Sequence, residues 1–253
     1  MIEKRLDLIE DRMFDARNRT DTSGPVELNT LLNSSTTGRP GITYLPTRVR
    51  ALRHFLNTCE YPSDSVFVDL GCGKGQTLLV ASRSAFKRVV GVENRHELCG
   101  IAVANAQVYR KRHRDAVPID VIEADAAEYE IRPDENVFYM YHPFGPDVIR
   151  QVVLNIRSSV ARRSRPVWIV YCRPMYCDVI ENRSDEAGVP GAFARVRTYR
   201  YALKEFAVYT MRHIGGVKAE GQTAEGLTLT AHRFSQSALL DPEWARGQSR
   251  IDA

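Results

Sequence analysis

Long apolar runs are absent from this sequence of 253 residues. No run approaches the roughly 20 apolar residues that a helix needs to cross a bilayer. The first residues, Met1-Ile-Glu-Lys-Arg-Leu, are charged and lack the apolar core of a secretion signal. We therefore expect a cytoplasmic protein that makes no contact with a membrane.

Paired cysteines and clustered metal ligands are absent as well. The five cysteines are an odd number and form no Cys-x-x-Cys motif, which favours reduced and mostly buried thiols. The six histidines are scattered without the spacing of a metal site, so we predict no bound metal. The net charge of +4 is mild, so it permits an acidic partner without requiring one.

The stretch around which the chain is organised begins at Val66. Val66–Asp69 predicts a buried strand that ends in a carboxylate, and Gln76–Ser84 predicts a helix. Gly71, Gly73 and Gly75 lie between them, where a Cβ would hold a ligand off the backbone. A strand, a turn of small residues and a helix form the first unit of a nucleotide-type cofactor site.

Two further acidic residues end predicted strands. Glu93 closes the apolar run from Val89, and Asp125 follows the run from Ile119. Glu93 follows Asp69 at close to the spacing of about 20 residues that is expected for a ribose-binding carboxylate. A ribose offers two hydroxyl donors, and a carboxylate at the carboxyl end of a strand can accept both hydrogen bonds.

Apolar strands alternate with helices through most of the chain. This pattern favours a Rossmann-like, doubly wound α/β fold whose mostly parallel sheet is covered on both faces. The last predicted segments alternate in polarity, as antiparallel strands at a sheet edge do. They are Phe193–Tyr201, Phe206–Met211 and Leu227–Phe234.

The N-terminal region is predicted to be a helical extension of this fold. Ile2, Leu6, Ile9 and Met13 form one stripe, which predicts an amphipathic helix packed on the main domain. A homodimer contact or a substrate lid is the alternative. The predicted divisions are a helix and loop over 1–42, a cofactor domain over 43–236 and a tail over 237–253.

From residue 43 to about 175, these features resemble the class I methyltransferases that depend on S-adenosylmethionine (SAM). Motif I of that family corresponds to Asp69-Leu-Gly-Cys-Gly-Lys-Gly75. The next three strand ends correspond to Glu93, Ala124-Asp125-Ala126 and Tyr141-His-Pro-Phe144. The resemblance implies SAM as the cofactor, bound by Tyr44, Thr47, Asp69, Gly71, Cys72, Gly73, Gln76, Glu93, Asp125, Ala126 and Tyr141.

The resemblance also implies a role for the principal residues. The first two glycines of the turn let the backbone approach the methionine part of SAM, and Asp69 organises the turn. Glu93 holds the ribose hydroxyls, and Asp125 accepts a hydrogen bond from the adenine amino group near the Ala126 backbone. Taken singly, each of these carboxylates has an alternative role as a helix N-cap.

A narrower resemblance connects the chain with the non-SET histone-lysine methyltransferases. It rests on Phe67–Gln76, on Phe144–Val148 and on Tyr44-x-x-Thr47, which closes over SAM in that family. The adjacent asparagines of that family are missing, the block Tyr141–Phe144 is one residue shorter, and there is no long basic nucleosome-binding region. Uncharacterised bacterial methyltransferases with an Asn-Pro-Phe version of the segment are more similar, so the histone substrate is not carried over.

His142 and Tyr141 are the catalytic candidates, at the end of the fourth strand. Methyl transfer requires an acceptor that is positioned and deprotonated, and a histidine with a pKa of about 6.5 suits proton abstraction near neutrality. The alternative is that His142 replaces the asparagine of an Asn-Pro-Phe loop as a packing residue. Tyr44, Tyr139 and Tyr141 are candidates for lining the acceptor pocket or packing over the sulfonium.

Three functions fit this set of residues. We favour methylation of an O or N atom of a small molecule, such as a natural product or a sugar. The second is methylation of a protein lysine or a nucleic acid, and the third is a SAM-binding module without turnover. A nicotinamide dehydrogenase is disfavoured because the turn reads Gly-x-Gly-x-Gly. For a nucleic-acid or protein substrate, the candidate basic face is Arg157, Arg162, Arg163, Arg165, Arg195, Arg197 and Arg200.

Overall fold

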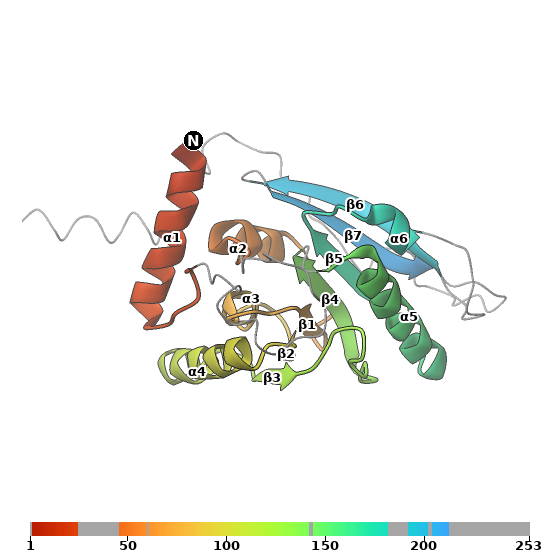
Figure 1. The fold of residues 1–253 in the computed structure, drawn as a ribbon, viewed down its shortest axis with the longest axis horizontal. Helices are drawn as coiled ribbons and strands as arrows, with labels where there is room; N and C mark the ends of the chain where they lie inside the picture. The colour runs from red at the N-terminus through yellow and green to blue at the C-terminus, as the bar shows by residue number, and fades with distance from the viewer. Residues whose placement is uncertain are drawn as a thin grey trace, which may run out of the picture.

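The structure is a computed structural model that describes residues 2–24, 46–59, 61–141, 144–181, 192–201 and 204–212 (Figure 1). Its helices are α1 (Ile2–Asn18), α2 (Val49–Thr58), α3 (Gln76–Ala81), α4 (His96–Arg112), α5 (Pro146–Arg162) and α6 (Cys177–Glu181). Its strands are β1 (Val66–Leu70), β2 (Arg88–Glu93), β3 (Ile119–Glu123), β4 (Glu135–Tyr141), β5 (Trp168–Cys172), β6 (Ala192–Tyr201) and β7 (Lys204–Arg212). The strand predicted at Leu227–Phe234 lies outside the described residues, and α6 was not predicted.

These strands form one sheet in the order β3-β2-β1-β4-β5-β7-β6. The first five strands are parallel, and β7 runs antiparallel to both β5 and β6. The predicted Rossmann-like α/β fold, with antiparallel strands at the C-terminal edge of a mostly parallel sheet, is therefore confirmed. The strand order reverses between β1 and β4, and in open sheets of this kind ligands bind beyond the carboxyl ends of the strands at that point.

The sheet separates two apolar layers. Phe67 of β1 packs in the layer that contains residues of α2, α3 and α4, whereas Val66 and Val68 pack in the layer that contains residues of α5 and α6. Figure 1 shows these two groups of helices on opposite sides of the sheet. Because helices cover both faces, every residue of β1 is buried, including Asp69 at its carboxyl end.

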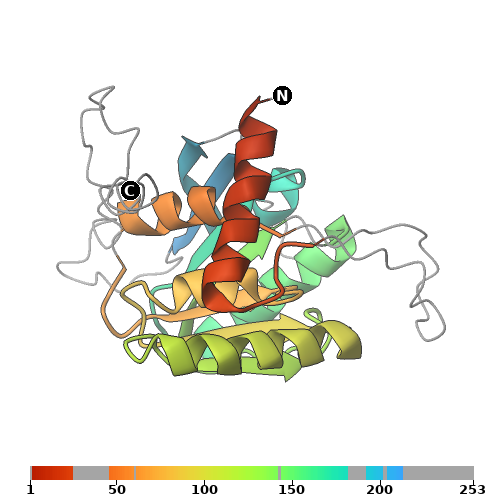
Figure 2. The same ribbon diagram turned by 90° about the vertical axis from the view of Figure 1, so that its left-hand side faces the viewer.

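The N-terminal helix α1 packs against α2 and α4 (Figure 2). The rings of Phe14 and Tyr109 stack with their centroids 6.0 Å apart. The predicted apolar stripe is wrong for its described members, because Ile9 and Met13 are 53 % and 37 % exposed. The inner side of α1 instead carries polar residues, and Asp11 accepts a hydrogen bond of 3.0 Å from the Val49 amide at the start of α2.

None of the described helices is both long enough and apolar enough to span a membrane.

Gly91 in β2 provides a test of the packing between β2 and α3. A Cβ at this position would lie 2.5 Å from Leu78 Cδ1 and 2.7 Å from Cys72 Sγ. We expect Gly91→Ala to lower the free energy of unfolding by about 1–3 kcal/mol in urea denaturation, as overpacking does. Gly100→Ala in α4 is the control, because a Cβ added there would have no neighbour within 4 Å and alanine favours a helix by about 1 kcal/mol. Equal effects of the two substitutions would contradict this packing.

Candidate active site

The glycine-rich turn after β1 depends on a backbone conformation that side chains disfavour. Gly71, Gly73 and Gly75 have φ angles of 82°, 54° and 85°. The Gly71 and Cys72 amides both donate to the carbonyl oxygen of Val92, at 2.8 and 3.0 Å, so the turn is fixed to the end of β2. Helix α3 begins directly after the turn, at Gln76. The turn therefore lies at the switch point of the sheet, where glycines have no side chain to block a ligand.

Glu93 fixes the other side of this turn. Its Oε2 atom accepts a hydrogen bond of 2.9 Å from the Gly73 amide, and its Oε1 atom accepts one of 3.1 Å from the Arg95 amide. The residue is only 8 % exposed. Burial raises the pKa of this carboxyl group, and the hydrogen bonds from Gly73 and Arg95 oppose that rise. The carboxylate is thus held rigidly, with lone pairs remaining for further donors.

Asp125 lies at the end of the neighbouring strand, and its side chain is exposed. Ala124 donates its amide to the Glu93 carbonyl oxygen at 3.0 Å, so the ends of β2 and β3 are joined. Asp125 Oδ1 accepts a hydrogen bond of 2.8 Å from the Ala127 amide within a turn, and no helix starts there, so Asp125 is not the helix N-cap that was considered as the alternative. That bond occupies one of the two carboxylate oxygens and leaves the other available to a further donor.

Asp69 and Gln76 are buried beside the turn. Asp69 is 3 % exposed, and burial raises its pKa to about 8, with a hydrogen bond from Thr77 opposing and Glu93 reinforcing the shift. Gln76 donates from Nε2 to Asp11 Oδ1 at 3.3 Å, while its buried Oε1 atom has no hydrogen-bond partner among the described residues. Burial therefore favours the protonated form of Asp69, and Gln76 Oε1 remains as an acceptor for a further hydrogen bond.

The groups around this turn fit an adenosyl cofactor. Glu93 and Asp125 are acceptors at neighbouring strand ends, which suits the hydroxyl donors of a ribose and the amino donor of an adenine. The positive φ angles of the three glycines disfavour any side chain at these positions of the turn. A dinucleotide would also need backbone amides of the turn to bind its phosphates. Here the Gly73 amide already donates its hydrogen bond to the Glu93 carboxylate.

The structure also describes part of the region around the end of β4, where the catalytic candidates were predicted. Tyr141, at the end of β4, accepts a hydrogen bond of 2.8 Å on its hydroxyl oxygen from Lys204 Nζ at the start of β7. The hydroxyl groups of Thr47 and Tyr139 share a hydrogen bond of 2.7 Å, and both residues are buried. Thr47 therefore braces β4 at the site. The positions of Tyr44 and His142 lie outside the described residues.

Lys204 was not predicted from the sequence, nor were the hydrogen bonds that join the turn to the segment after α1. Lys74 Nζ lies 3.1 Å from both carboxylate oxygens of Asp21. Asn105 Nδ2 donates to the carbonyl oxygens of Asp21 and Lys74, each at 3.0 Å. Asp15 holds the same segment, because it accepts hydrogen bonds from the amides of Thr22 and Ser23 at 2.7 to 3.0 Å. Such long-range polar pairs have no periodic signal in a sequence.

The predicted basic face is not a continuous surface of free cations. Arg157 is buried, and Arg165 donates to the carbonyl oxygens of Arg132, Glu135 and Arg163. Arg195 pairs with Glu181, and Arg200 pairs with Glu205. These four arginines therefore contribute mainly to local structure.

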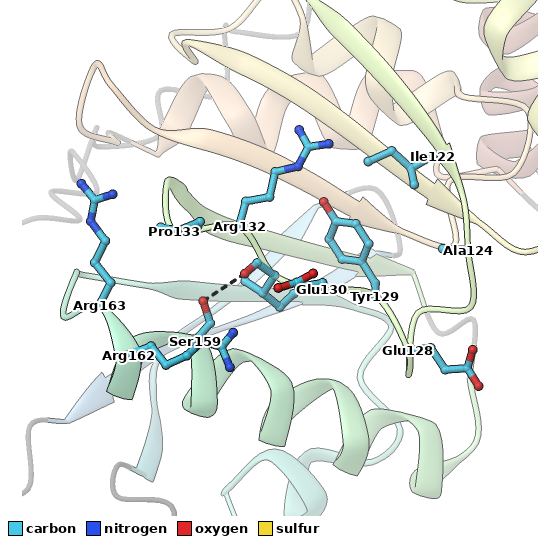
Figure 3. A pocket seen from close by; sticks show the side chains of 11 residues that line it. Ile122, Ala124, Glu128, Tyr129, Glu130, Arg132, Pro133, Ser159, Arg162 and Arg163 are labelled. Atoms are coloured by element: carbon cyan, nitrogen blue, oxygen red, sulfur yellow. Dashed lines mark hydrogen bonds between the residues drawn. The ribbon is translucent and has the colours of Figure 1, made fainter.

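A separate cavity of about 530 Å³ lies between β3, the segment before β4 and the end of α5 (Figure 3). Its lining includes Tyr129, Arg132, Ser159, Arg162 and Arg163, and Figure 3 shows the Ser159 hydroxyl hydrogen-bonded within it. None of the residues of the glycine-rich turn lines this cavity. The cavity therefore excludes the turn, although Ala124, next to Asp125, contributes to its lining.

The raised pKa of Asp69 makes stability depend on pH. The carboxyl group titrates at its ordinary value of 3.8 in the unfolded chain and at about 8 in the folded protein. Between these values the folded state binds more protons, so the free energy of unfolding falls as the pH rises. We expect Asp69→Asn to flatten this dependence in denaturant titrations, because an amide resembles the protonated carboxyl group. Parallel pH profiles for the two proteins would contradict the assignment.

Comparisons with known proteins agree with this geometry. Residues 35–117 match the family model described as Histone methylation protein DOT1. A histone-lysine N-methyltransferase of Dictyostelium discoideum, specific for H3 lysine-79, is 31 % identical over 107 residues, which cover 38 % of this chain and 6 % of that protein. A protein-lysine N-methyltransferase of Saccharolobus islandicus is 33 % identical over 69 residues, or 27 % of this chain and 43 % of that protein. The chain thus spans less than half the length of either relative.

Solved structures with a similar fold include an RNA methyltransferase from Salinibacter ruber in complex with S-adenosyl-L-homocysteine. It is 18 % identical with a TM-score of 0.45, and the match covers 68 % of this chain and 97 % of that chain. The family model, the two lysine methyltransferases and the strand order agree with the resemblance to methyltransferases that use SAM. The resemblance predicted from the sequence is confirmed: the chain has the fold and motifs of a class I SAM-dependent methyltransferase, with a distant likeness to the histone-lysine methyltransferases.

Proposed function

We propose that this protein transfers a methyl group from SAM to the side-chain amine of a lysine in a protein substrate. The observation that carries the proposal is the DOT1 match over 35–117, which includes the glycine-rich turn and Glu93. Both sequence relatives are named as lysine methyltransferases, and this chain covers only part of each. The acceptor proposed here therefore differs from the small molecule favoured on the sequence alone.

On the cofactor side, each group has a separate task. SAM supplies a methyl group on a sulfonium, which is its own leaving group. Gly71 and Gly73 allow close approach of the backbone, and Glu93 accepts from the ribose hydroxyls. The carboxylate of Asp125 accepts from the adenine amino group. Because Glu93 is already fixed by two amides, it binds without further ordering.

On the acceptor side, the protein must orient an amine and take up its proton. Tyr141 ends the strand beside β1, at the switch point, and Lys204 donates to its hydroxyl oxygen. The phenolic O–H is consequently directed away from Lys204 and is available to the acceptor. His142 follows Tyr141 directly and stays the candidate base.

A small-molecule acceptor is the second candidate, and Lys204 is the observation that favours it. Its ammonium group lies 5.0 Å from the centre of the Tyr141 ring. A cation in this place repels a protonated amine and attracts an acceptor that carries a carboxylate or phosphate.

Transfer of a labelled methyl group from SAM into a cell lysate separates the candidates. We expect label in the protein fraction, on lysine residues identified by tandem mass spectrometry. Label confined to the small-molecule fraction would support the second candidate and overturn the first. Binding of SAM without label in any fraction would indicate a module without turnover.

Asp125→Ala is expected to weaken SAM binding by about 10-fold, because one charge-assisted hydrogen bond is lost. Isothermal titration calorimetry measures this change. Glu128→Gln is the matched control, because Glu128 is an exposed carboxylate three residues away whose loss should leave the affinity unchanged. Equal affinities for the wild type and Asp125→Ala would remove Asp125 from the cofactor site.

Lys204→Met is expected to lower kcat about 10-fold with little change in the affinity for SAM, because the hydrogen bond that orients Tyr141 is lost. Lys204→Arg retains a donor and should recover most of the activity. Steady-state kinetics on the labelled acceptor, with calorimetry for SAM, distinguish this effect from unfolding. A Lys204→Met variant with full kcat would show that the contact has no part in turnover.

A further inference from the structure

A set of exposed cations lies outside the residues of the glycine-rich turn, and we call it the α1–α4 basic patch. Its members come from the end of α1, from α2, from the turn after α3 and from the end of α4. They are Arg17, Arg19, Arg53, Arg83, Arg110, Lys111, Arg112 and Arg114, and all of them are exposed.

Specific contacts bring these segments together. His113 Nε2 lies 2.7 Å from Asn18 Oδ1, so the end of α4 meets the end of α1. Tyr109 stacks on Phe14 one helical turn earlier, and the charges of Arg53 and Arg83 act on its hydroxyl. Figures 1 and 2 show the lower part of α1 beside α4. Arg53 and Arg83 therefore lie near the ends of α1 and α4, although they are far from both helix ends in the sequence.

Helix stability explains only part of this patch. Cations in the last turn of a helix interact favourably with its dipole, at about 0.3–1 kcal/mol each. Here two helix C-termini meet, so their cations also repel one another. Within the described part of the chain, the ion pair of Arg83 with Asp115 at 3.0 Å is the sole one that these residues make. Such self-repulsion destabilises a fold unless an anionic partner offsets it.

We propose that the α1–α4 basic patch binds the phosphate backbone of a nucleic acid. Seven of its eight members are arginines, whose planar guanidinium groups match phosphate oxygens with two hydrogen bonds. The groups spread over several helices, as contacts along a polyanion require, instead of converging on one pocket that would suit a single carboxylate. The patch does not include any residue of the turn or of Tyr141 and Lys204, so it docks the enzyme and takes no part in methyl transfer.

Binding of the full-length protein to a fluorescein-labelled DNA duplex of about 20 base pairs, measured by anisotropy, tests the proposal. We expect the double variant Arg112→Glu/Arg114→Glu to raise Kd at least 10-fold at low salt. The plot of the logarithm of the association constant against the logarithm of the salt concentration has a negative slope. Its magnitude should decrease by about 0.9 for each phosphate contact that is lost. Arg162→Glu/Arg163→Glu is the control, because it makes the same charge change at the exposed end of α5.

Three results would overturn the proposal. They are absence of duplex binding by the wild-type protein, an equal loss in both double variants, and binding of polyglutamate as tight as that of the duplex. The last result would indicate an acidic protein as the partner. Thermal unfolding of both variants checks that each is folded. The Asp125→Ala variant should bind the duplex as the wild-type protein does. A loss of methyl transfer can therefore be distinguished from a loss of duplex binding.

Discussion

The hydrogen bond from the Gly73 amide to Glu93 is the interaction on which the site depends. It joins the turn after β1 to the end of β2, and the two amides that donate to Val92 strengthen the same connection. The turn can approach β2 so closely because its glycines have positive φ angles and because Gly91 leaves room for Leu78 and Cys72. A buried carboxylate is costly, and here the amide donors compensate for the cost. The same carboxylate keeps lone pairs that these two amides do not use.

This arrangement also explains why two neighbouring acids behave differently. Asp69 is more deeply buried than Glu93, and burial raises its pKa to about 8. Glu93 receives two backbone donors that favour its charged form. A single anion beside the turn is tolerated where two would repel each other. Burial therefore raises the pKa of both acids, and only Glu93 has backbone amides from Gly73 and Arg95 that oppose the rise.

The fold was predictable from the sequence because its signals are local and periodic. Val66–Asp69 and Val89–Glu93 are continuous apolar runs with an acid at the end, and both are parallel strands of the sheet. The carboxylates of Glu93 and Asp125 could be found because strand ends of a parallel sheet share one edge. The apolar stripe on α1 misled, because Asp11 and Phe14 face inward where Ile9 and Met13 were expected. Contacts such as Lys204 with Tyr141 join residues 63 positions apart and leave no pattern in either segment.

The polar attachment of α1 has a consequence for the native ensemble. Asp11, Asp15 and Asn18 are its buried polar residues, whereas Phe14 is its one buried apolar side chain among the described ones. Water can replace each hydrogen bond when the helix separates, so local opening costs far less than global unfolding. Amide hydrogen exchange in α1 should accordingly be faster than in the central strands. Because Asp11 bonds to Gln76 and the following segment reaches Lys74, each opening also loosens the turn that the cofactor needs. The fraction of molecules with an ordered glycine-rich turn is thus set by the equilibrium between the packed and the separated N-terminal helix.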